Sequence, residues 1–215
     1  VDVGNICVTG VIDHHGSKLE EKHCGAATLL VVQEPNLVVD QPADDDGNIA
    51  IVTHENPDLD ATCASYFTLT LRSGKTLGKS AEILANYVDE VDRGRIPDFE
   101  DPTRNLYAIF QGIYQHLIIS NKLNSNPLIA SEQVMRRGLK LMDFVHERIR
   151  DGHNPFEADL FPTRHPFRDE ARAIQKDCDL YLSDLKRGAR RLLRIPRTFG
   201  EGCKTVDSFT ISNPE

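Results

Sequence analysis

Short apolar runs alternate in the first hundred residues with segments whose apolar positions recur every three or four residues. Residues 49–53, Ile-Ala-Ile-Val-Thr, are short, continuous and apolar, as is typical of a buried parallel strand. Further strands are predicted over residues 5–13 and 36–40, and helices over residues 25–33, 58–71 and 80–91. This alternation predicts the α/β class, with a mainly parallel β-sheet flanked by helices.

The second half of the chain has mainly helical periodicity. Helices are predicted over residues 104–120, 131–150 and 167–193, followed by a strand-like segment at 205–212. The predicted organisation is therefore an α/β domain at residues 1–100 and a mainly helical region at residues 101–215. The second region is either an extension of that domain or the start of another one.

Composition describes an ordinary globular chain. It has 215 residues, of which 40% are hydrophobic and 27% charged, and its five cysteines form no Cys-x-x-Cys pair, which indicates free thiols. No apolar run approaches the roughly 20 residues that span a bilayer, and no signal-like start is present, so a cytoplasmic protein without a membrane partner is predicted. The net charge of −8 disfavours nonspecific nucleic-acid binding, although bound divalent cations would offset part of it.

Two compact clusters of metal-ligating residue types stand next to apolar runs. The first is Asp13-His14-His15, and the second contains His54, Asp58 and Asp60 just after the strand at 49–53. A ligand-bearing loop between a strand and a helix is typical of sites in open α/β sheets. Carboxylates combined with imidazoles suit manganese, magnesium or zinc ions that activate water. Two more carboxylates could complete such a site, namely Asp2 and Asp92.

These motifs resemble those of the DHH phosphoesterase superfamily. The resemblance rests on Asp-His-His-Gly at 13–16 and His-Glu-Asn-Pro-Asp-Leu-Asp-Ala at 54–61, with weaker likeness at 1–4, 25–28 and 91–94. The superfamily includes family II manganese pyrophosphatases and RecJ-type and MYG1-type nucleases. The resemblance covers roughly residues 1–95 and implies a Rossmann-like domain of the DHH type.

The resemblance also implies roles for individual residues. Two ions, Mn²⁺ or Mg²⁺, would be held by six ligands: His54, Asp58, Asp60, His14, Asp2 and Asp92. Asp13 would orient the imidazoles, and His15 would contact the scissile phosphate or protonate the leaving group. The protein itself would mainly position the substrate and neutralise its charge.

The predicted function is that of a divalent-metal-dependent phosphohydrolase. Its substrate would be a small nucleotide, pyrophosphate or a short oligonucleotide. A RecJ-like or MYG1-like single-strand exonuclease is the alternative within enzymes, and a metal-binding regulatory or scaffold protein is the alternative outside them. The oligomeric state stays open, with a homodimer as one possibility.

The order of the motifs differs from the family. The family usually places the His-x-x-x-Asp-x-Asp motif before Asp-His-His, whereas here the motif at 54–60 follows the one at 13–15. Either the chain is circularly permuted, or a motif lies on an N-terminal part outside this sequence.

Overall fold

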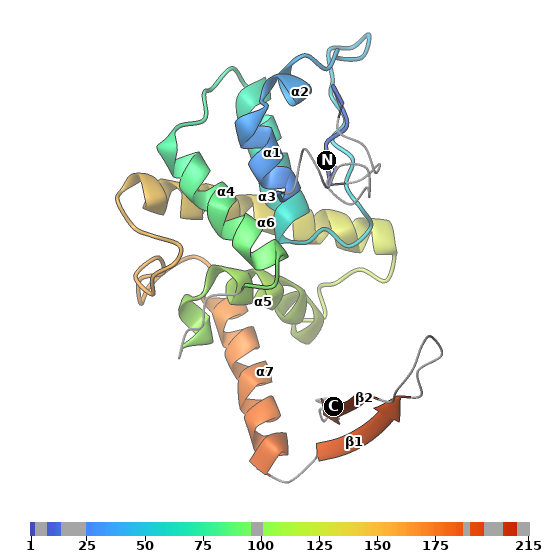
Figure 1. The fold of residues 1–215 in the computed structure, drawn as a ribbon, viewed down its shortest axis with the longest axis vertical. Helices are drawn as coiled ribbons and strands as arrows, with labels where there is room; N and C mark the ends of the chain where they lie inside the picture. Colours follow the sequence, from blue (N-terminus) through green and yellow to red (C-terminus); the bar gives the residue numbers. More distant parts are fainter. Residues whose placement is uncertain (3–7, 14–24, 96–100, 187–189, 196–203, 210–215) are drawn as a thin grey trace.

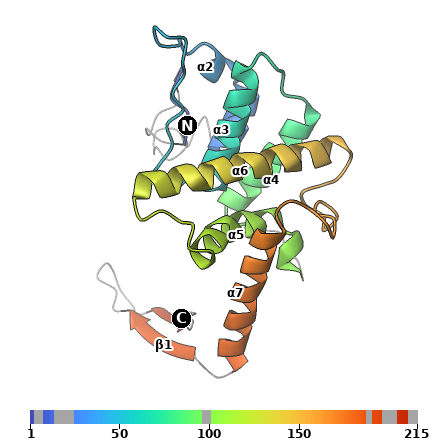
Figure 2. The ribbon, with the colours of Figure 1, turned by 180° about the vertical axis from the view of Figure 1, so that it is seen from behind.

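Helices make up most of the regular structure in the computed structural model, which describes residues 1–2, 8–13, 25–95, 101–186, 190–195 and 204–209. In chain order the elements are α1 (Ala27–Gln33), α2 (Asn36–Val39), α3 (Leu59–Arg72), α4 (Lys79–Asp92), η1 (Pro102–Arg104), α5 (Leu106–Ile119), α6 (Pro127–Arg150), α7 (Arg168–Lys186), β1 (Arg190–Ile195) and β2 (Lys204–Phe209). Helices α1, α3 and α4 pack together, and α6 crosses them (Figures 1 and 2). Helix α7 packs on α5 and extends away from this group.

The longer helices begin where the sequence offers a side-chain cap. Asp58, Asn105 and Asn126 precede α3, α5 and α6, and each accepts a hydrogen bond from a backbone N–H of the first turn. Such caps satisfy N–H groups that have no acceptor within the helix, and each stabilises it by about 1 kcal/mol. The predicted helices at 58–71, 80–91, 104–120 and 131–150 are confirmed as α3, α4, α5 and α6.

The core lies between the apolar faces of these helices. Phe67 of α3, Leu84 of α4, Phe110 of α5 and Leu141 of α6 are all fully buried in one cluster. Helices α3 and α6 approach so closely that a Cβ at Gly138 would lie 2.7 Å from Thr62 Cγ2. Elements on both sides of the predicted boundary at residue 100 therefore share one hydrophobic core.

The predicted parallel sheet is wrong. In the part of the chain that the structure describes, the only sheet is the antiparallel pair β1–β2, apart from a single bridge between Val8 and Val11. Residues 36–40 are mainly helix α2 rather than a strand. Residues 49–53 carry no ladder within the described residues, and Val52 is 63% exposed.

The physical reason is that an extended segment needs neighbouring strands to pair its backbone groups. In the described part of the chain, no strand forms a ladder with residues 49–53, and the apolar faces of α1, α3 and α4 are covered by other helices instead. The predicted Rossmann-like arrangement, in which such faces cover a sheet, is therefore replaced by helix-on-helix packing. The helix predicted at 167–193 is also too long, since α7 ends at Lys186 and β1 follows.

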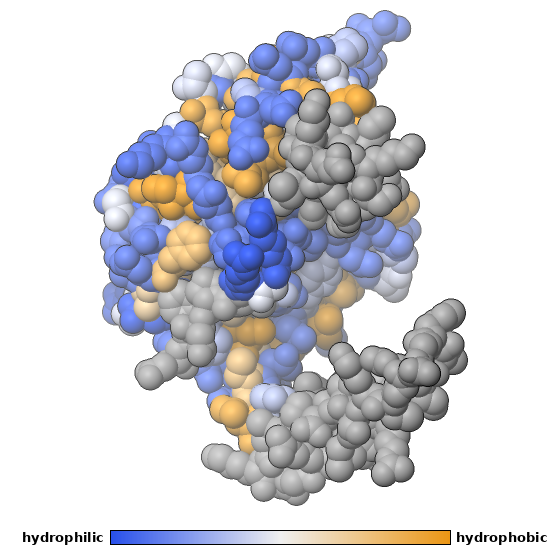
Figure 3. Space-filling view, in the orientation of Figure 1, coloured by the Kyte–Doolittle hydropathy of each residue, from blue (hydrophilic) through white to orange (hydrophobic). Residues whose placement is uncertain are grey.

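The surface is mainly hydrophilic on the face that Figure 3 shows, and hydrophobic residues reach it in scattered groups in the upper, middle and lower parts of that view. Val39 and Val52 belong to the large hydrophobic side chains that are exposed. Among the helices that the structure describes, none combines the length and the apolar content that crossing a bilayer requires.

Candidate metal centre

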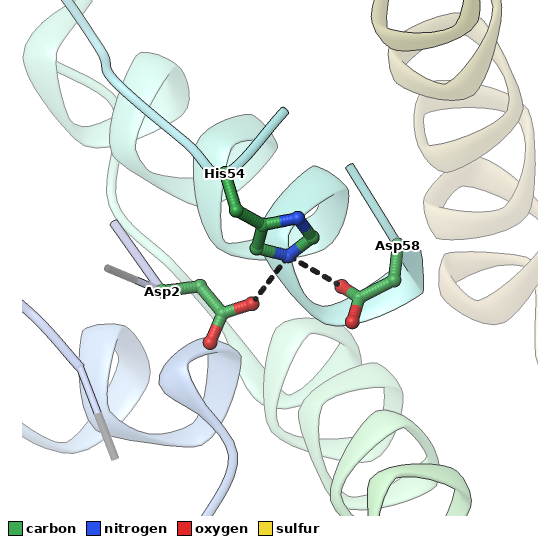
Figure 4. Close-up of side chains that lie close together, drawn as sticks. All are labelled: Asp2, His54 and Asp58. Carbon is green, nitrogen blue, oxygen red and sulfur yellow. Dashed lines mark hydrogen bonds and ion pairs between the residues drawn. The ribbon is translucent and has the colours of Figure 1, made fainter. Parts of the chain in front are cut away.

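Three side chains from two distant parts of the sequence meet at one point. His54 Nε2 lies 3.1 Å from Asp2 Oδ2 and 3.7 Å from Asp58 Oδ1 (Figure 4). One potential ligand atom from each of the three residues lies within 4.8 Å of the other two. Two carboxylates and an imidazole in this arrangement could bind one divalent cation from one side, leaving its remaining positions for water or substrate.

Backbone hydrogen bonds place Asp2 beside His54. The Asp2 N–H donates to the Ile12 carbonyl at 2.6 Å, and the Val1 nitrogen donates to the Val52 carbonyl at 2.7 Å. Asp2 has a φ of 56°, a left-handed conformation that aspartate adopts more readily than most residues. The start of the sequence, residues 11–13 and residues 51–54 are thereby brought together.

The start of helix α3 places Asp58. Its Oδ1 caps the helix by accepting from the Ala61 N–H at 2.9 Å, and the buried Pro57 precedes it. The other oxygen and the remaining lone pairs of Oδ1 can still face a cation. Asp2 is 2% exposed, whereas the side chains of His54 and Asp58 are 33% and 51% exposed, so the group opens to solvent on the side of Asp58.

Asp13 lies next to this group but outside it. It is 2% exposed and directly follows Ile12, to which Asp2 is bonded. Burial lowers the pKa of the Val1 amine, while the negative charges of Asp2 and Asp13 act in the opposite direction. Both carboxylates therefore face the same small region. The predicted residues His14 and His15 lie outside the described residues.

Asp60 anchors helix α1. Its two carboxylate oxygens accept hydrogen bonds from the Ala27 and Thr28 N–H groups at 2.7 and 2.8 Å, and the Thr28 hydroxyl donates to the Asp60 carbonyl at 3.0 Å. A negative charge at a helix N-terminus is favourable because unpaired N–H groups point toward it. Asp89 accepts from the Ala26 N–H at 2.8 Å and completes this anchor. The predicted ligand Asp60 thus has a structural role that its position in the motif did not reveal.

Asp92 lines a small cavity together with Asp58 and Asp60. The cavity, of about 200 Å³, is lined by Asp58, Asp60 and Asp92 and by Tyr107 and Gln111 of α5. The end of α4 therefore brings Asp92 to the same side of the molecule as the start of α3. The structure places these three predicted ligands around one space, whereas Asp2 and His54 approach Asp58 without lining that cavity.

Helix α5 contributes polar side chains that the sequence motifs did not point to. Tyr107, Gln111 and Tyr114 follow an i, i+4, i+7 spacing, which places them along one face. The Tyr114 hydroxyl is buried and has no hydrogen-bond partner among the described residues. Burial and the negative charge of Asp58 raise the pKa of Tyr114, which places this phenol near the site. In the sequence, only this helical spacing could have pointed to these three residues, and the same spacing is common in helix faces without a functional role.

Comparison with known proteins gives no further guidance, since no protein-family model, curated protein or solved structure matches the chain.

Proposed function

We propose that this chain is a divalent-metal-dependent phosphohydrolase that uses Mn²⁺ or Mg²⁺. The observation that carries the proposal is the convergence of Asp2, His54 and Asp58, since Asp2 and His54 are 52 residues apart in sequence. The donor set consists of the buried carboxylate of Asp2, the imidazole of His54 and the exposed carboxylate of Asp58. Oxygen and imidazole donors of this kind suit these ions. The likeness of the motifs to DHH phosphoesterases supports the same assignment.

A second ion would lie in the cavity formed by Asp58, Asp60 and Asp92. Asp60 lines this cavity together with Asp92, and its carboxylate would hold the second ion in addition to anchoring α1. Asp58 lines this cavity and also belongs to the group with His54, so it would link the two ion positions. His14, by resemblance, would complete the second position.

When bound, the ions would acidify a water molecule and neutralise the charge of a phosphoryl group. The chain itself would position the substrate. Gln111 lines the cavity beside Asp58, and its amide can donate a hydrogen bond to a phosphate oxygen. The Tyr114 hydroxyl, near Asp58 and without a partner among the described residues, can do the same. The small size of the cavity favours a single phosphoryl group of a small nucleotide, pyrophosphate or an oligonucleotide end.

The first test measures metal binding. Isothermal titration with Mn²⁺ is expected to show binding to the native chain, weakened at least about 100-fold in Asp58→Ala and in His54→Ala, because each variant loses a direct ligand. Asp45→Ala is the matched control, since Asp45 is an exposed carboxylate that belongs neither to the group around His54 nor to the lining of the acidic cavity. A native chain that binds neither Mn²⁺ nor Mg²⁺ would overturn the proposal.

The second test measures hydrolysis of an aryl phosphodiester, pyrophosphate and a short oligonucleotide with added Mn²⁺. Turnover that is lost in Asp58→Ala and retained in Asp45→Ala supports the phosphohydrolase. Turnover on the oligonucleotide alone, with steep salt dependence, would instead indicate an exonuclease. Metal binding without turnover on any substrate would indicate a metal-binding scaffold and overturn the enzymatic part.

A further inference from the structure

A second group of interacting polar side chains lies toward the other end of helix α3. Ser80 Oγ lies 2.8 Å from His146 Nε2, and the Tyr66 hydroxyl lies 3.1 Å from His146 Nδ1 and 3.2 Å from Asp143 Oδ1. All four residues line one cavity of about 820 Å³. They come from α3, α4 and α6, so the group is held by helices whose packing forms the core.

The chemistry of the four groups fixes the direction of these hydrogen bonds. An ionised Asp143 can only accept, so the Tyr66 hydroxyl donates its one proton to it. The Tyr66 oxygen must then accept from His146, which places the imidazole proton on Nδ1. His146 Nε2 consequently carries a lone pair and accepts the proton of Ser80. This is the order of groups in a Ser-His-Asp triad, with a tyrosine inserted between histidine and aspartate.

The imidazole is held in place and kept neutral. His146 is 8% exposed and makes edge-to-face contacts with the rings of Tyr66 and Phe67, at centroid distances of 5.7 and 5.8 Å. Burial, and next the nearby Arg150, lower the pKa of His146, against the opposing effect of Asp143. A neutral, oriented imidazole can act as a general base at neutral pH. Burial raises the pKa of Tyr66 above its usual range, so this phenol stays protonated and continues to donate.

The surroundings of Ser80 suit an acyl group. Ser80 is the second residue of α4, whose N-cap is Gly78 and therefore has no capping side chain. The first N–H groups of a helix lack intrahelical acceptors and attract negative charge, which develops on the carbonyl oxygen during acyl transfer. The same cavity is lined by three cations, Lys75, Lys140 and Arg150, and by two carboxylates, Asp143 and Glu147, which leaves an excess of one positive charge. This excess favours a substrate that carries a negative charge of its own.

We propose that Ser80 is the nucleophile of a second, metal-independent site that hydrolyses carboxylic esters bearing an anionic group. Ser80 Oγ attacks the acyl carbon while its proton passes to His146 Nε2. The tetrahedral intermediate collapses, and the alcohol leaves with the proton from His146. Water then attacks the acyl-serine ester with His146 again accepting a proton, which releases the carboxylic acid and restores the Ser80 hydroxyl. Each cycle consumes one ester and one water.

This site is separate from the candidate metal centre. Asp58 and Tyr66 are eight positions apart, which corresponds to about 12 Å along helix α3. The two cavities share no lining residue. The serine site therefore does not depend on the phosphohydrolase proposal, and chelation of metal with EDTA is expected to leave it unchanged.

A fluorophosphonate probe tests the nucleophile directly, because an activated serine displaces fluoride from phosphorus and stays covalently labelled. We expect the native chain to gain one label in intact mass, with peptide mapping at Ser80, in the presence of EDTA. Ser80→Ala is expected to abolish labelling. The matched control is Ser73→Ala, since Ser73 lines the same cavity and donates to the Thr70 carbonyl instead of to a histidine. A folded native chain without label at Ser80, or with label at Ser73, would overturn the proposal.

Tyr66→Phe tests the order of the groups without removing the ring from the core. The variant removes the oxygen that accepts the His146 Nδ1–H, so the imidazole proton is no longer held on Nδ1. Labelling of Ser80 is therefore expected to slow at least about tenfold. His146→Gln removes the base and is expected to slow labelling by about 100-fold or more. An unchanged rate in Tyr66→Phe would show that the chain of hydrogen bonds is only a means of satisfying buried polar groups.

The charge of the substrate is tested with two 4-nitrophenyl esters, acetate and hydrogen succinate. The native chain is expected to hydrolyse the succinate ester with a kcat/KM about fivefold higher, and Lys140→Gln is expected to reduce that preference, because it removes one favourable charge contact. Equal values for both esters would overturn the assignment of an anionic substrate.

Discussion

The two ends of helix α3 are built in different ways. At its start, Asp2 and His54 stand on segments outside helices and strands, and Asp58 is the N-cap of the helix. Toward its other end, Tyr66, Ser80, Asp143 and His146 all stand within helices. The residues of the first group belong to segments whose sequence resembles known motifs, and their arrangement depends on how loops approach each other. The second has no sequence motif and depends on helix packing alone.

This difference predicts opposite sensitivities. A change in the helical core should disturb the serine site more than the metal centre, and a change in the acidic residues should do the reverse. Four measurements can confirm or break this contrast.

The largest expected effect follows from Phe67→Ala. Phe67 is fully buried and contacts the rings of Tyr66 and His146, so its loss leaves a cavity beside the serine site. We expect the free energy of unfolding, measured by urea denaturation, to fall by about 3–5 kcal/mol. Labelling of Ser80 should slow in the folded variant, whereas the Kd for Mn²⁺ should stay within about twofold.

Leu69→Ala is the control on the same helix. Leu69 is 48% exposed, and its truncation should change stability by about 0.5 kcal/mol or less. If Phe67→Ala and Leu69→Ala lowered the rate of Ser80 labelling equally, the serine site would not depend on the packing of the core around Phe67.

The next effect in size is stabilisation by metal. A ligand that binds only the folded chain stabilises it by about 2.7 kcal/mol at a concentration of 100 times its Kd. Thermal unfolding with Mn²⁺ at that ratio should therefore show a higher Tm. The increase should vanish in Asp58→Ala and persist in Ser80→Ala. A Tm increase that survives the loss of Asp58 would place the ion elsewhere.

Asp60 and Asp89 allow the structural and ligand roles of a carboxylate to be separated. Both accept backbone hydrogen bonds at the start of α1, and only Asp60 lines the acidic cavity. Replacement of either by asparagine should lower the free energy of unfolding by about 1–3 kcal/mol, because a buried N–H loses its charged acceptor. Stability is to be measured by urea denaturation without metal.

Metal affinity should then distinguish the two variants. Asp60→Asn should weaken Mn²⁺ binding at least about tenfold relative to Asp89→Asn, measured by titration calorimetry. If both variants bind Mn²⁺ equally well, Asp60 serves only as the anchor of α1.

The contrast between the two ends also explains what the sequence could predict. The helix α3 follows from a local signal, its apolar face, and was predicted, and its cap Asp58 is of a residue type that is common at helix starts. The likeness of the motifs singled out His54 and Asp58, which the structure brings together. Asp2 was a candidate from its residue type and from that likeness, but its contact with His54 was not predictable from a local pattern, since the two residues are 52 positions apart.

The fold class was mistaken because a short apolar run does not reveal its partners. The run at residues 49–53 has the composition of a buried strand, but pairing is a tertiary property, and the described residues give it no ladder. The serine site was missed for a related reason. Its histidine lies 66 residues from Ser80 and 80 residues from Tyr66, so no sequence spacing connects these residues.

The smallest predicted effect is the response of the serine site to pH. His146 is surrounded by Ser80 of α4, by Tyr66 and Phe67 of α3, and by Asp143 and Arg150 of α6. Because folding lowers its pKa, the unfolded chain binds a proton more readily than the folded chain as the pH falls below about 6.5. The contribution of His146 to the free energy of unfolding is therefore complete above that pH and decreases as the pH falls toward the lowered pKa of the folded state.

Urea denaturation at pH 7.5, 6.5 and 5.5 measures this loss, and subtraction of the same series for His146→Gln isolates it from other titrating groups. The difference between native and variant should shrink as the pH falls. Probe labelling of Ser80 should decline over the lower part of the same range, since protonated Nε2 cannot accept the serine proton. A difference that grows on acidification would mean that the folded state stabilises the imidazolium, and His146 would then be paired with Asp143 rather than serving Ser80 as a base.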